Sequence, residues 1–213
     1  MKDIAIYGAG GLGREVACLL NIINEAGPQW RLIGFFDDGL PCGSRNEYGE
    51  ILGGIDELNG WNGPLNVVMA IGSPKILDIV TKKITNPQIE FPNIIAPDVI
   101  SYGNIYDKLG HGNIIGFGSV LSCNTRLGDF NIFNGFVTLG HDSVLGNCNV
   151  AMPGTRLSGE LKVGDCNLFG ANSFVHQGVR IGSGIHLGAC SALLRRPKDG
   201  CTYLGVPALI MKF

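Results

Sequence analysis

Apolar residues recur at every sixth position through the second half of this chain. They fill fifteen successive places of that frame, from Leu109 to Leu193, although only 45% of the chain is apolar. Neither the 3.6-residue period of a helix nor the two-residue period of a strand produces this spacing. The segment must therefore fold as a repeat of six residues.

Glycine follows the apolar position in nine of the fifteen repeats. A short strand that ends at a sharp corner accounts for this pattern, with the apolar side chain inward and a glycine free to adopt positive φ. Three such sides close one coil of 18 residues, so the frame predicts about five stacked coils. At about 4.8 Å per coil, we expect a triangular parallel β-helix roughly 24 Å tall.

Residues 18 apart should then lie directly above one another. Four asparagines share one such column, which predicts a ladder of stacked amides; they are Asn113, Asn131, Asn149 and Asn167. Cys148 and Cys166 share another column, within disulfide reach. We expect both to remain small buried thiols.

Composition narrows the possible partners. The net charge is −2 and only 16% of residues are charged, so no basic surface for nucleic acid or an anionic membrane is expected. The low charge favours an oligomer.

Seven cysteines without a C-x-x-C pair indicate reduced thiols. An N-terminal apolar run too short for a secretory signal, and no run of 18 apolar residues, lead us to expect a cytoplasmic protein with no membrane span.

The first half has a different pattern, typical of alternating strands and helices. Residues 4–7 predict a buried strand, followed by a glycine loop and a helix from about 14 to 25. Strands at 31–36 and 66–71 follow, the second leading through Gly72 into a helix that ends near 84. We predict an α/β domain over residues 1–95, equivalent to half of a Rossmann fold, and an all-β domain over residues 96–213.

Gly8, Gly10 and Gly13 match the spacing of a dinucleotide-binding loop, and Asp37 and Asp38 follow the next strand. Backbone N–H groups at a helix N-terminus bind phosphate. The size of the domain favours a mononucleotide head over a whole dinucleotide. A tight turn without any ligand is the alternative.

Four histidines are present, His111, His141, His176 and His186. No two are five residues apart, as the zinc ligands of prism-shaped carbonic anhydrases are, so no metal site is predicted. His141 follows Gly140 at a corner, where it should point outward beside Asp142. That pairing suits a general base, although a solvated turn histidine has the same pattern.

Several motifs together resemble the bacterial hexapeptide-repeat sugar acetyltransferases. This family includes nucleotide-aminosugar N-acetyltransferases of glycan pathways and sialic-acid O-acetyltransferases. The motifs are residues 8–16 (GAGGLGREV), 36–38 (FDD), 70–72 (AIG), 140–142 (GHD) and 205–208 (GVPA). The resemblance implies a left-handed parallel β-helix, a homotrimer, and acetyl-CoA bound in the groove between neighbouring prisms. It further implies acetyl transfer to the amine of a nucleotide-linked sugar, expected to be a 4-amino-4,6-dideoxy sugar.

The resemblance also assigns roles to individual residues. His141 matches the general base, Asp142 its acidic partner, and Gly159 a backbone N–H near the thioester carbonyl. The substrate-binding residues implied are Gly8, Gly10, Gly11, Asp37, Asp38 and Gly72. The acetyl-CoA contacts implied are Gly159, Gly170, Ala171, Gly188, Ala189 and Pro207, while Arg195, Arg196 and Lys198 either meet coenzyme phosphates or form a solvated basic face.

Two positions depart from the family pattern. The family usually has histidine at the position of Leu12. It often has a second histidine at the position of Val150. Valine cannot relay a proton or hydrogen-bond the acetyl donor. Three alternatives therefore stay open: an O-acetyltransferase acting on sialic acid or another sugar, a hydride-transfer enzyme using NAD(P), and a nucleotide-sensing or scaffold trimer without catalysis.

Overall fold

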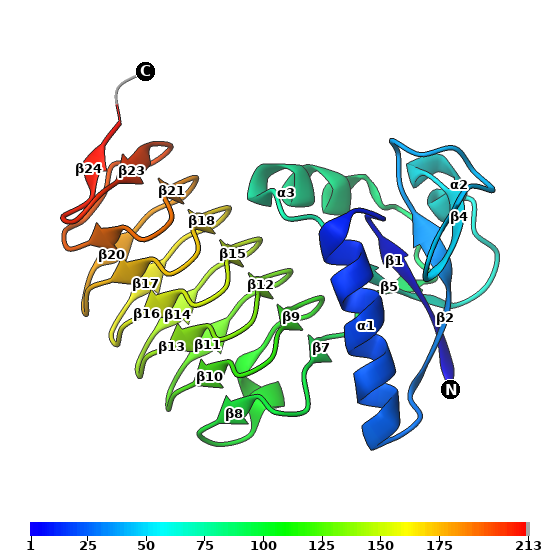
Figure 1. The fold of residues 1–213 in the computed structure, drawn as a ribbon, viewed down its shortest axis with the longest axis horizontal. Coiled ribbons are helices and arrows are strands. Elements are labelled where there is room, and N and C mark those ends of the chain that lie inside the picture. The colour runs from blue at the N-terminus through cyan, green and yellow to red at the C-terminus, as the bar shows by residue number, and fades with distance from the viewer. Residues whose placement is uncertain (212–213) are drawn as a thin grey trace.

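The computed structural model describes residues 1–211. Figure 1 shows an α/β domain on one side and a stack of triangular coils on the other. The α/β domain holds a sheet of order β3-β4-β2-β1-β5-β6, parallel except for the β3–β4 pair. Its strands are β1 (Lys2–Tyr7), β2 (Trp30–Phe36), β3 (Arg45–Asn46), β4 (Gly49–Gly53), β5 (Leu65–Met69) and β6 (Ile89–Glu90).

Three helices belong to this domain, α1 (Gly11–Ala26), α2 (Ile55–Asn59) and α3 (Pro74–Lys83). The apolar face of α1 is buried against the sheet through Val16, Leu20 and Ile23. Pro74 opens α3, where a missing N–H costs nothing. The alternation predicted from the sequence is therefore confirmed. The short β3–β4 hairpin and α2 were not predicted, because neither has enough residues to show a period.

The coils form three faces, and within each face the strands run parallel to one another with one exception. Face 1 contains β7 (Ile94–Ile95), β9 (Ile114–Ile115), β12 (Ile132–Phe133), β15 (Val150–Ala151), β18 (Leu168–Phe169), β21 (His186–Leu187), β23 (Thr202–Leu204) and β24 (Leu209–Ile210), the last antiparallel. Face 2 contains β8 (Ile100–Ser101), β10 (Val120–Leu121), β13 (Thr138–Leu139), β16 (Arg156–Leu157), β19 (Phe174–Val175) and β22 (Ala192–Leu193). Face 3 contains β11 (Arg126–Leu127), β14 (Val144–Leu145), β17 (Lys162–Val163) and β20 (Arg180–Ile181).

We name the corners by the faces they join. Corner A leads from face 1 to face 2 and includes residues 134–137, 152–155, 170–173 and 188–191. Corner B leads from face 2 to face 3 and includes residues 122–125, 140–143, 158–161 and 176–179. Corner C leads from face 3 back to face 1 and includes residues 128–131, 146–149 and 164–167. This parallel β-helix with its α/β domain confirms the predicted fold class.

The coils begin earlier than the apolar frame indicated. Ile94 of face 1 pairs with Ile114, 20 residues further on, whereas Ile114 pairs with Ile132 in the regular 18-residue register. The two extra residues lie in the loop after Ser101, which contains a 3-10 helix, Ile105–Lys108. This insertion shifts the frame and hides the first coil from a six-residue search.

The amide ladder predicted from the asparagine column is confirmed. At corner C, Asn149 Nδ2 donates to Asn131 Oδ1 at 3.0 Å, and Asn167 Nδ2 donates to Asn149 Oδ1 at 2.8 Å. These side chains are fully buried. The ladder satisfies polar groups that the coil interior would otherwise leave without partners.

The frame glycines have a different role from the one predicted. None of them has positive φ; that conformation falls two residues later, as at Asp142, where φ is 57°. Glycine is required for a different reason, because a β-carbon on Gly140 or Gly170 would overlap the backbone of the next coil. Besides glycine, the left-handed position of the coils holds Asn, Asp, Cys, Phe and Glu in this chain.

The two domains share one core. Outward side chains of face 1, including Ile94, Ile114 and Val150, are buried in the same cluster as the α/β sheet residues. The inward side chains of the coils form a second cluster along the prism axis. The α/β domain therefore covers the first coils of face 1, at the N-terminal end of the prism, and leaves faces 2 and 3 open.

Candidate active site

His141 lies at corner B, immediately after β13. Its Nδ1 is 2.8 Å from Asp142 Oδ2, and its side chain is 44% exposed. The outward direction predicted from the sequence is therefore confirmed. A neutral imidazole that donates from Nδ1 to a carboxylate keeps an acceptor lone pair on Nε2, the arrangement that a general base needs.

Asn124 completes this arrangement from the coil below. Its Nδ2 donates to Asp142 Oδ1 at 2.9 Å. This hydrogen bond, followed by the one from His141, lowers the pKa of Asp142 below its ordinary value. Asn124 was not predicted, although the signal was present, since it stands 18 residues before Asp142 in the same column.

Gly159 lies directly above His141, 18 residues further along. A β-carbon on Gly159 would lie 2.7 Å from His141 Nε2, so only glycine leaves room for the ring in this position. Within residues 1–211, no acceptor is paired with the N–H of Gly159. The imidazole and this open backbone donor thus share one small region of corner B.

Apart from Gly159, the residues implied in acetyl-CoA binding lie elsewhere on the same chain. Gly170 and Gly188 stack 18 apart at corner A, as do Ala171 and Ala189. The segment of Pro207 closes the same corner, because Ala208 N donates to Ala192 O at 2.8 Å. Face 2 separates this small-residue column from His141. A single chain therefore does not bring the two groups together.

The glycine loop connects β1 to α1, as predicted. A β-carbon on Gly8, where φ is 103°, would lie 2.6 Å from Ala70 O, whereas Gly10, Gly11 and Gly72 face open space. The N-terminus of α1 has no side-chain cap and no acidic residue in its first turn. Its backbone N–H groups are thus available to an anion.

Asp37 and Asp38 lie at the carboxyl end of β2, beside this loop. Asp37 Oδ2 accepts from Ala9 N at 2.8 Å, and Asp38 Oδ2 accepts from Tyr7 Oη at 2.7 Å. Burial, and then this contact with Asp38, raise the pKa of Tyr7 above its ordinary value, which keeps the phenol a donor. Both aspartates hold the loops together, and a ligand would use their remaining lone pairs.

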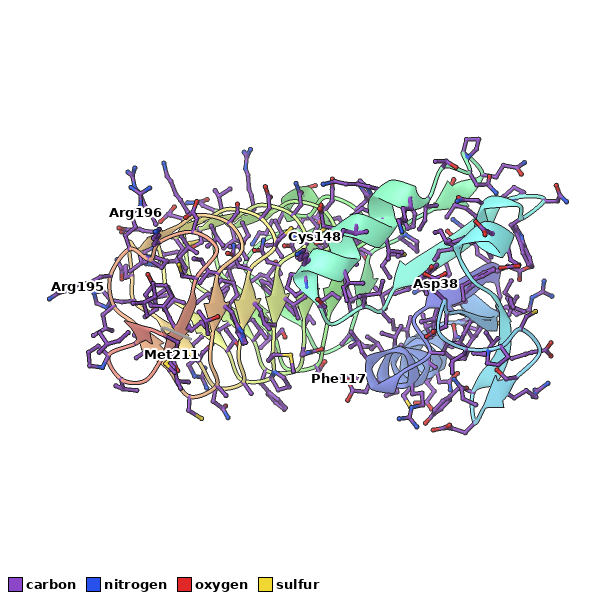
Figure 2. The ribbon with its side chains drawn as sticks, turned by 90° about the horizontal axis from the view of Figure 1, so that it is seen from above. Asp38, Phe117, Cys148, Arg195, Arg196 and Met211 are labelled. Atoms are coloured by element: carbon purple, nitrogen blue, oxygen red, sulfur yellow. The ribbon has the colours of Figure 1, made fainter. Side chains whose placement is uncertain are left out.

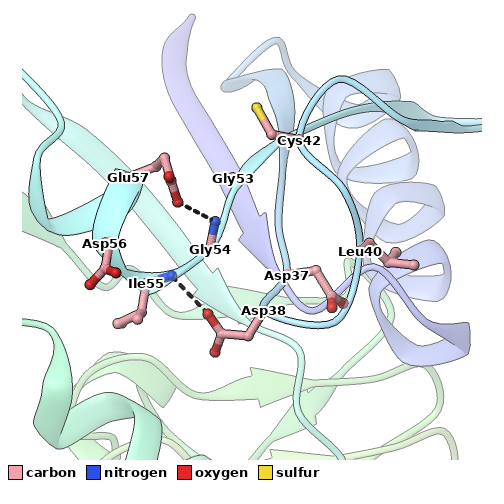
Figure 3. Close-up of a pocket in the computed structure, with 9 residues that line it drawn as sticks. All are labelled: Asp37, Asp38, Leu40, Cys42, Gly53, Gly54, Ile55, Asp56 and Glu57. Atoms are coloured by element: carbon pink, nitrogen blue, oxygen red, sulfur yellow. Dashed lines mark hydrogen bonds between the residues drawn. The ribbon is translucent and has the colours of Figure 1, made fainter.

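A cavity of about 290 Å³ opens next to these aspartates. Figure 3 shows Asp38 accepting from Ile55 N, at 2.8 Å, and Glu57 accepting from Gly54 N, at 2.7 Å. The residues that line it are Asp37, Asp38, Leu40, Cys42, Gly53, Gly54, Ile55, Asp56 and Glu57. The cavity is acidic and lies at the carboxyl end of the sheet, where parallel α/β domains bind ligands.

The two departures from the family pattern have different surroundings. Val150 is fully buried in the core shared by the two domains, where a histidine would lose its hydration. Leu12 lines an apolar groove of about 390 Å³ between α1 and corner A, opposite Phe117 and Phe136. Figure 2 shows Phe117 at the side of the prism that faces the α/β domain.

The remaining histidines have other environments. His111 Nδ1 is 2.9 Å from Asp129 Oδ1, and its ring packs edge-on against Phe130. His176 and His186 are exposed. In residues 1–211, no three His, Cys, Asp or Glu side chains are grouped to hold a metal ion. No helix in that range is both long and apolar enough to span a membrane.

Comparison with known proteins agrees with this geometry. Residues 3–84 match the family model of the PglD N-terminal domain. The whole chain is 29% identical to 97% of a GDP-perosamine N-acetyltransferase from Escherichia coli O157:H7. It superposes with a TM-score of 0.87 on the acetyltransferase domain of PglB from Neisseria gonorrhoeae, at 27% identity over 99% of this chain and 100% of that one.

Over its whole length the chain is thus similar to sugar acetyltransferases, the family that its motifs resemble. The family predicted from the sequence is therefore confirmed. The PglB domain has also been solved in complex with acetyl coenzyme A. A more limited match, 39% identity over 71 residues, links 33% of this chain to 27% of an acyl-[acyl-carrier-protein]–UDP-N-acetylglucosamine O-acyltransferase from Burkholderia lata.

Proposed function

We propose that this chain transfers the acetyl group of acetyl-CoA to the amine of a nucleotide-linked amino sugar, with His141 as the general base. The observation that carries this proposal is the pairing of His141 Nδ1 with Asp142 at 2.8 Å, on an exposed corner, with Nε2 beside Gly159 of the next coil. The names of the full-length relatives support the reaction class, and the acetyl-CoA complex of the PglB domain supports the donor.

His141 Nε2 removes a proton from the acceptor amine as its nitrogen attacks the thioester carbonyl. The new N–C bond gives a tetrahedral intermediate, which collapses with loss of the C–S bond and release of the coenzyme thiolate. Asp142, kept ionised by Asn124, fixes the tautomer and stabilises the imidazolium that forms. A well-placed base of this kind contributes about 10²–10⁴-fold to rate.

Gly159 N–H is the donor we assign to the oxyanion. At corner C, the equivalent N–H groups are bound by side chains of the next coil; Asp129 N, for example, donates to Asn147 Oδ1 at 2.7 Å. The N–H of Gly159 has no such partner in residues 1–211. A preorganised backbone donor of this kind is worth on the order of 10²–10³-fold in turnover.

A homotrimer accounts for the separation of the two corners. A cyclic oligomer uses two different surfaces of each subunit at every interface. We infer that corner B of one subunit, with His141, faces corner A of its neighbour, with Ala171 and Ala189. Exposed Phe136 and Phe174, on corner A and face 2, support burial at such an interface. Cross-linking and light scattering test the stoichiometry.

The nucleotide of the acceptor is assigned to the α/β domain. Gly10 and Gly11 leave space for a phosphate at the start of α1, and the acidic cavity beside Asp38 suits hydrogen-bond donors of a base or ribose. We also propose that the domain boundary lies near residue 95 and that the enzyme acts in the cytoplasm, where acetyl-CoA and nucleotide sugars are available.

The test is release of free thiol from acetyl-CoA with a panel of UDP-, dTDP- and GDP-linked 4-amino sugars. We expect His141→Ala to abolish turnover and His186→Ala, an exposed histidine on face 1, to retain it. A product that hydrolyses in mild base is an ester and would support O-acetylation instead. Nicotinamide binding, or the absence of turnover with every acceptor, would contradict the proposal.

A further inference from the structure

The outward side chains of faces 2 and 3 differ in charge. On face 3, the first residues of the strands are Arg126, Val144, Lys162 and Arg180. On face 2, the corresponding residues are Ile100, Val120, Thr138, Arg156, Phe174 and Ala192. Face 3 therefore has the composition of a solvated surface, whereas face 2 is apolar except at two positions.

Arg156 is the one charged side chain in the outward column of face 2. In the strand ladder its neighbours are Thr138 on one side and Phe174 on the other, so neither adjacent coil supplies a carboxylate there. Within residues 1–211, Arg156 takes part in no ion pair. The Glu160 carboxylate, four residues later, instead accepts from Gln177 Nε2 at 3.1 Å. If face 2 is covered, this guanidinium needs a counter-charge from outside its own chain.

The proposed homotrimer covers face 2, and in this respect the inference rests on the proposed function. Face 2 is the side between corners A and B, the two corners that face neighbouring subunits. Three triangular prisms closed through these corners by a threefold axis enclose their three copies of face 2 and turn corner C outward. The α/β domain lies against face 1 and leaves this closure free (Figure 1).

Arg156 then lies close to the threefold axis. One side of a coil has six residues, which span at most about 20 Å at 3.3 Å per residue. The middle of such a side is about 6 Å from the centre of an equilateral triangle built on it, and β16 lies at the middle of face 2. An extended arginine side chain reaches about 7 Å from its Cα atom. The three guanidinium groups therefore meet at the axis, where their like charges repel one another.

We propose that three copies of Arg156 bind a single tetrahedral oxyanion, phosphate or sulfate, on the threefold axis of the trimer. Three oxygens of such an anion are related by the same threefold symmetry, so each guanidinium can donate to one of them. The anion removes the repulsion between the arginines and links the three subunits. A single chain holds one third of this site.

Calorimetry of the full-length protein with inorganic phosphate, at constant ionic strength, tests the site. We expect a class of sites with one phosphate per three chains. Arg156→Leu should lose this class, with at least a tenfold fall in affinity. Arg126→Leu should retain it, because Arg126 is an exposed arginine at the same strand position on face 3. Absence of the one-per-three class in the parent, or an equal loss in Arg126→Leu, would overturn the inference.

Thermal unfolding provides the second readout. Phosphate should raise the midpoint of the parent and of Arg126→Leu above that in sodium chloride of equal ionic strength, and should leave Arg156→Leu unchanged. The competing counter-charge is Glu160 of the partner subunit. Loss of stability in Glu160→Gln equal to that in Arg156→Leu, with no effect of phosphate on the parent, would favour that ion pair and refute the anion site.

Neither readout requires turnover, so this inference and the proposed reaction fail separately. A trimer that transfers acetyl groups without binding phosphate at one per three chains contradicts only the anion site. A trimer that binds phosphate in this ratio and transfers no acetyl group supports the anion site and contradicts only the proposed reaction. Light scattering that gives a monomer would contradict the trimer and the anion site together.

Discussion

The imidazole of His141 lies across Gly159, the residue directly above it in the next coil. A β-carbon on Gly159 would approach His141 Nε2 to 2.7 Å, so the ring position depends on the missing side chain. The hydrogen bond from Nδ1 to Asp142 holds the ring from the other side. The imidazole is therefore held by the Asp142 carboxylate of its own coil. It fits in this position because the next coil has no side chain at Gly159.

Gly159→Ala should remove activity without unfolding the protein. The new methyl forces the imidazole off its present position, and we expect kcat to fall about 10²–10³-fold. Steady-state kinetics and the thermal midpoint are the measurements. Gly27→Ala serves as control, because a β-carbon there meets nothing within 4 Å. Full activity in Gly159→Ala would show that the ring position does not matter.

Asn124→Ala should raise the pKa of Asp142 toward its ordinary value. The amide of Asn124 makes the largest contribution to the lowered pKa, and the substitution removes it. Carbon-detected NMR titration of the carboxyl group measures the change. Asn172→Ala is the matched control, since Asn172 is exposed and has the same φ of 54° but lies at corner A.

The same pair of variants predicts a pH dependence of stability. A carboxyl whose pKa is lowered by folding stabilises the protein above its unfolded pKa, and this contribution disappears as pH falls through the folded pKa. At pH 7 the free energy of unfolding of Asn124→Ala should therefore be lower than that of Asn172→Ala, and this difference should shrink below about pH 4. Urea unfolding at both pH values measures it. A difference that is independent of pH would contradict the assigned cause.

Asn149→Ala should destabilise the coils strongly. The substitution leaves two backbone groups of the next coil without hydrogen bonds, the N–H of Asn167 and the carbonyl oxygen of Gly164. At about 1–3 kcal/mol for each unsatisfied group, we expect a loss of roughly 3 kcal/mol in the free energy of unfolding. Urea denaturation measures it. The exposed Asn62→Ala should change stability by less than about 0.5 kcal/mol.

Cys148 should resist alkylation in the folded protein. Its side chain is buried at corner C, and burial raises the pKa of its thiol to about 12. The neutral form therefore persists through pH 8, where only about one molecule in 10⁴ carries the reactive thiolate. Iodoacetamide followed by mass spectrometry should modify exposed Cys42, Cys123 and Cys190 first. Labelling of Cys148 at the rate of Cys123 would contradict its burial.

The sequence determined the features that depend on short, regular spacing. The apolar frame follows from the six-residue repeat, and the asparagine column follows from the 18-residue register of the coils. The pairing of His141 with Asp142 follows from their adjacency in the chain. The β-α alternation of the first half was readable for the same reason, because each element is long enough to show its own period.

Only the tertiary structure decided how separate columns relate to one another. It placed His141 at corner B and Ala171 at corner A, and it buried Val150 beneath the α/β domain. It also showed that Asp37 and Asp38 already accept hydrogen bonds from other segments, Asp37 from Ala9 N and Asp38 from Ile55 N. These relationships depend on packing between segments far apart in the chain, and no local period encodes such packing.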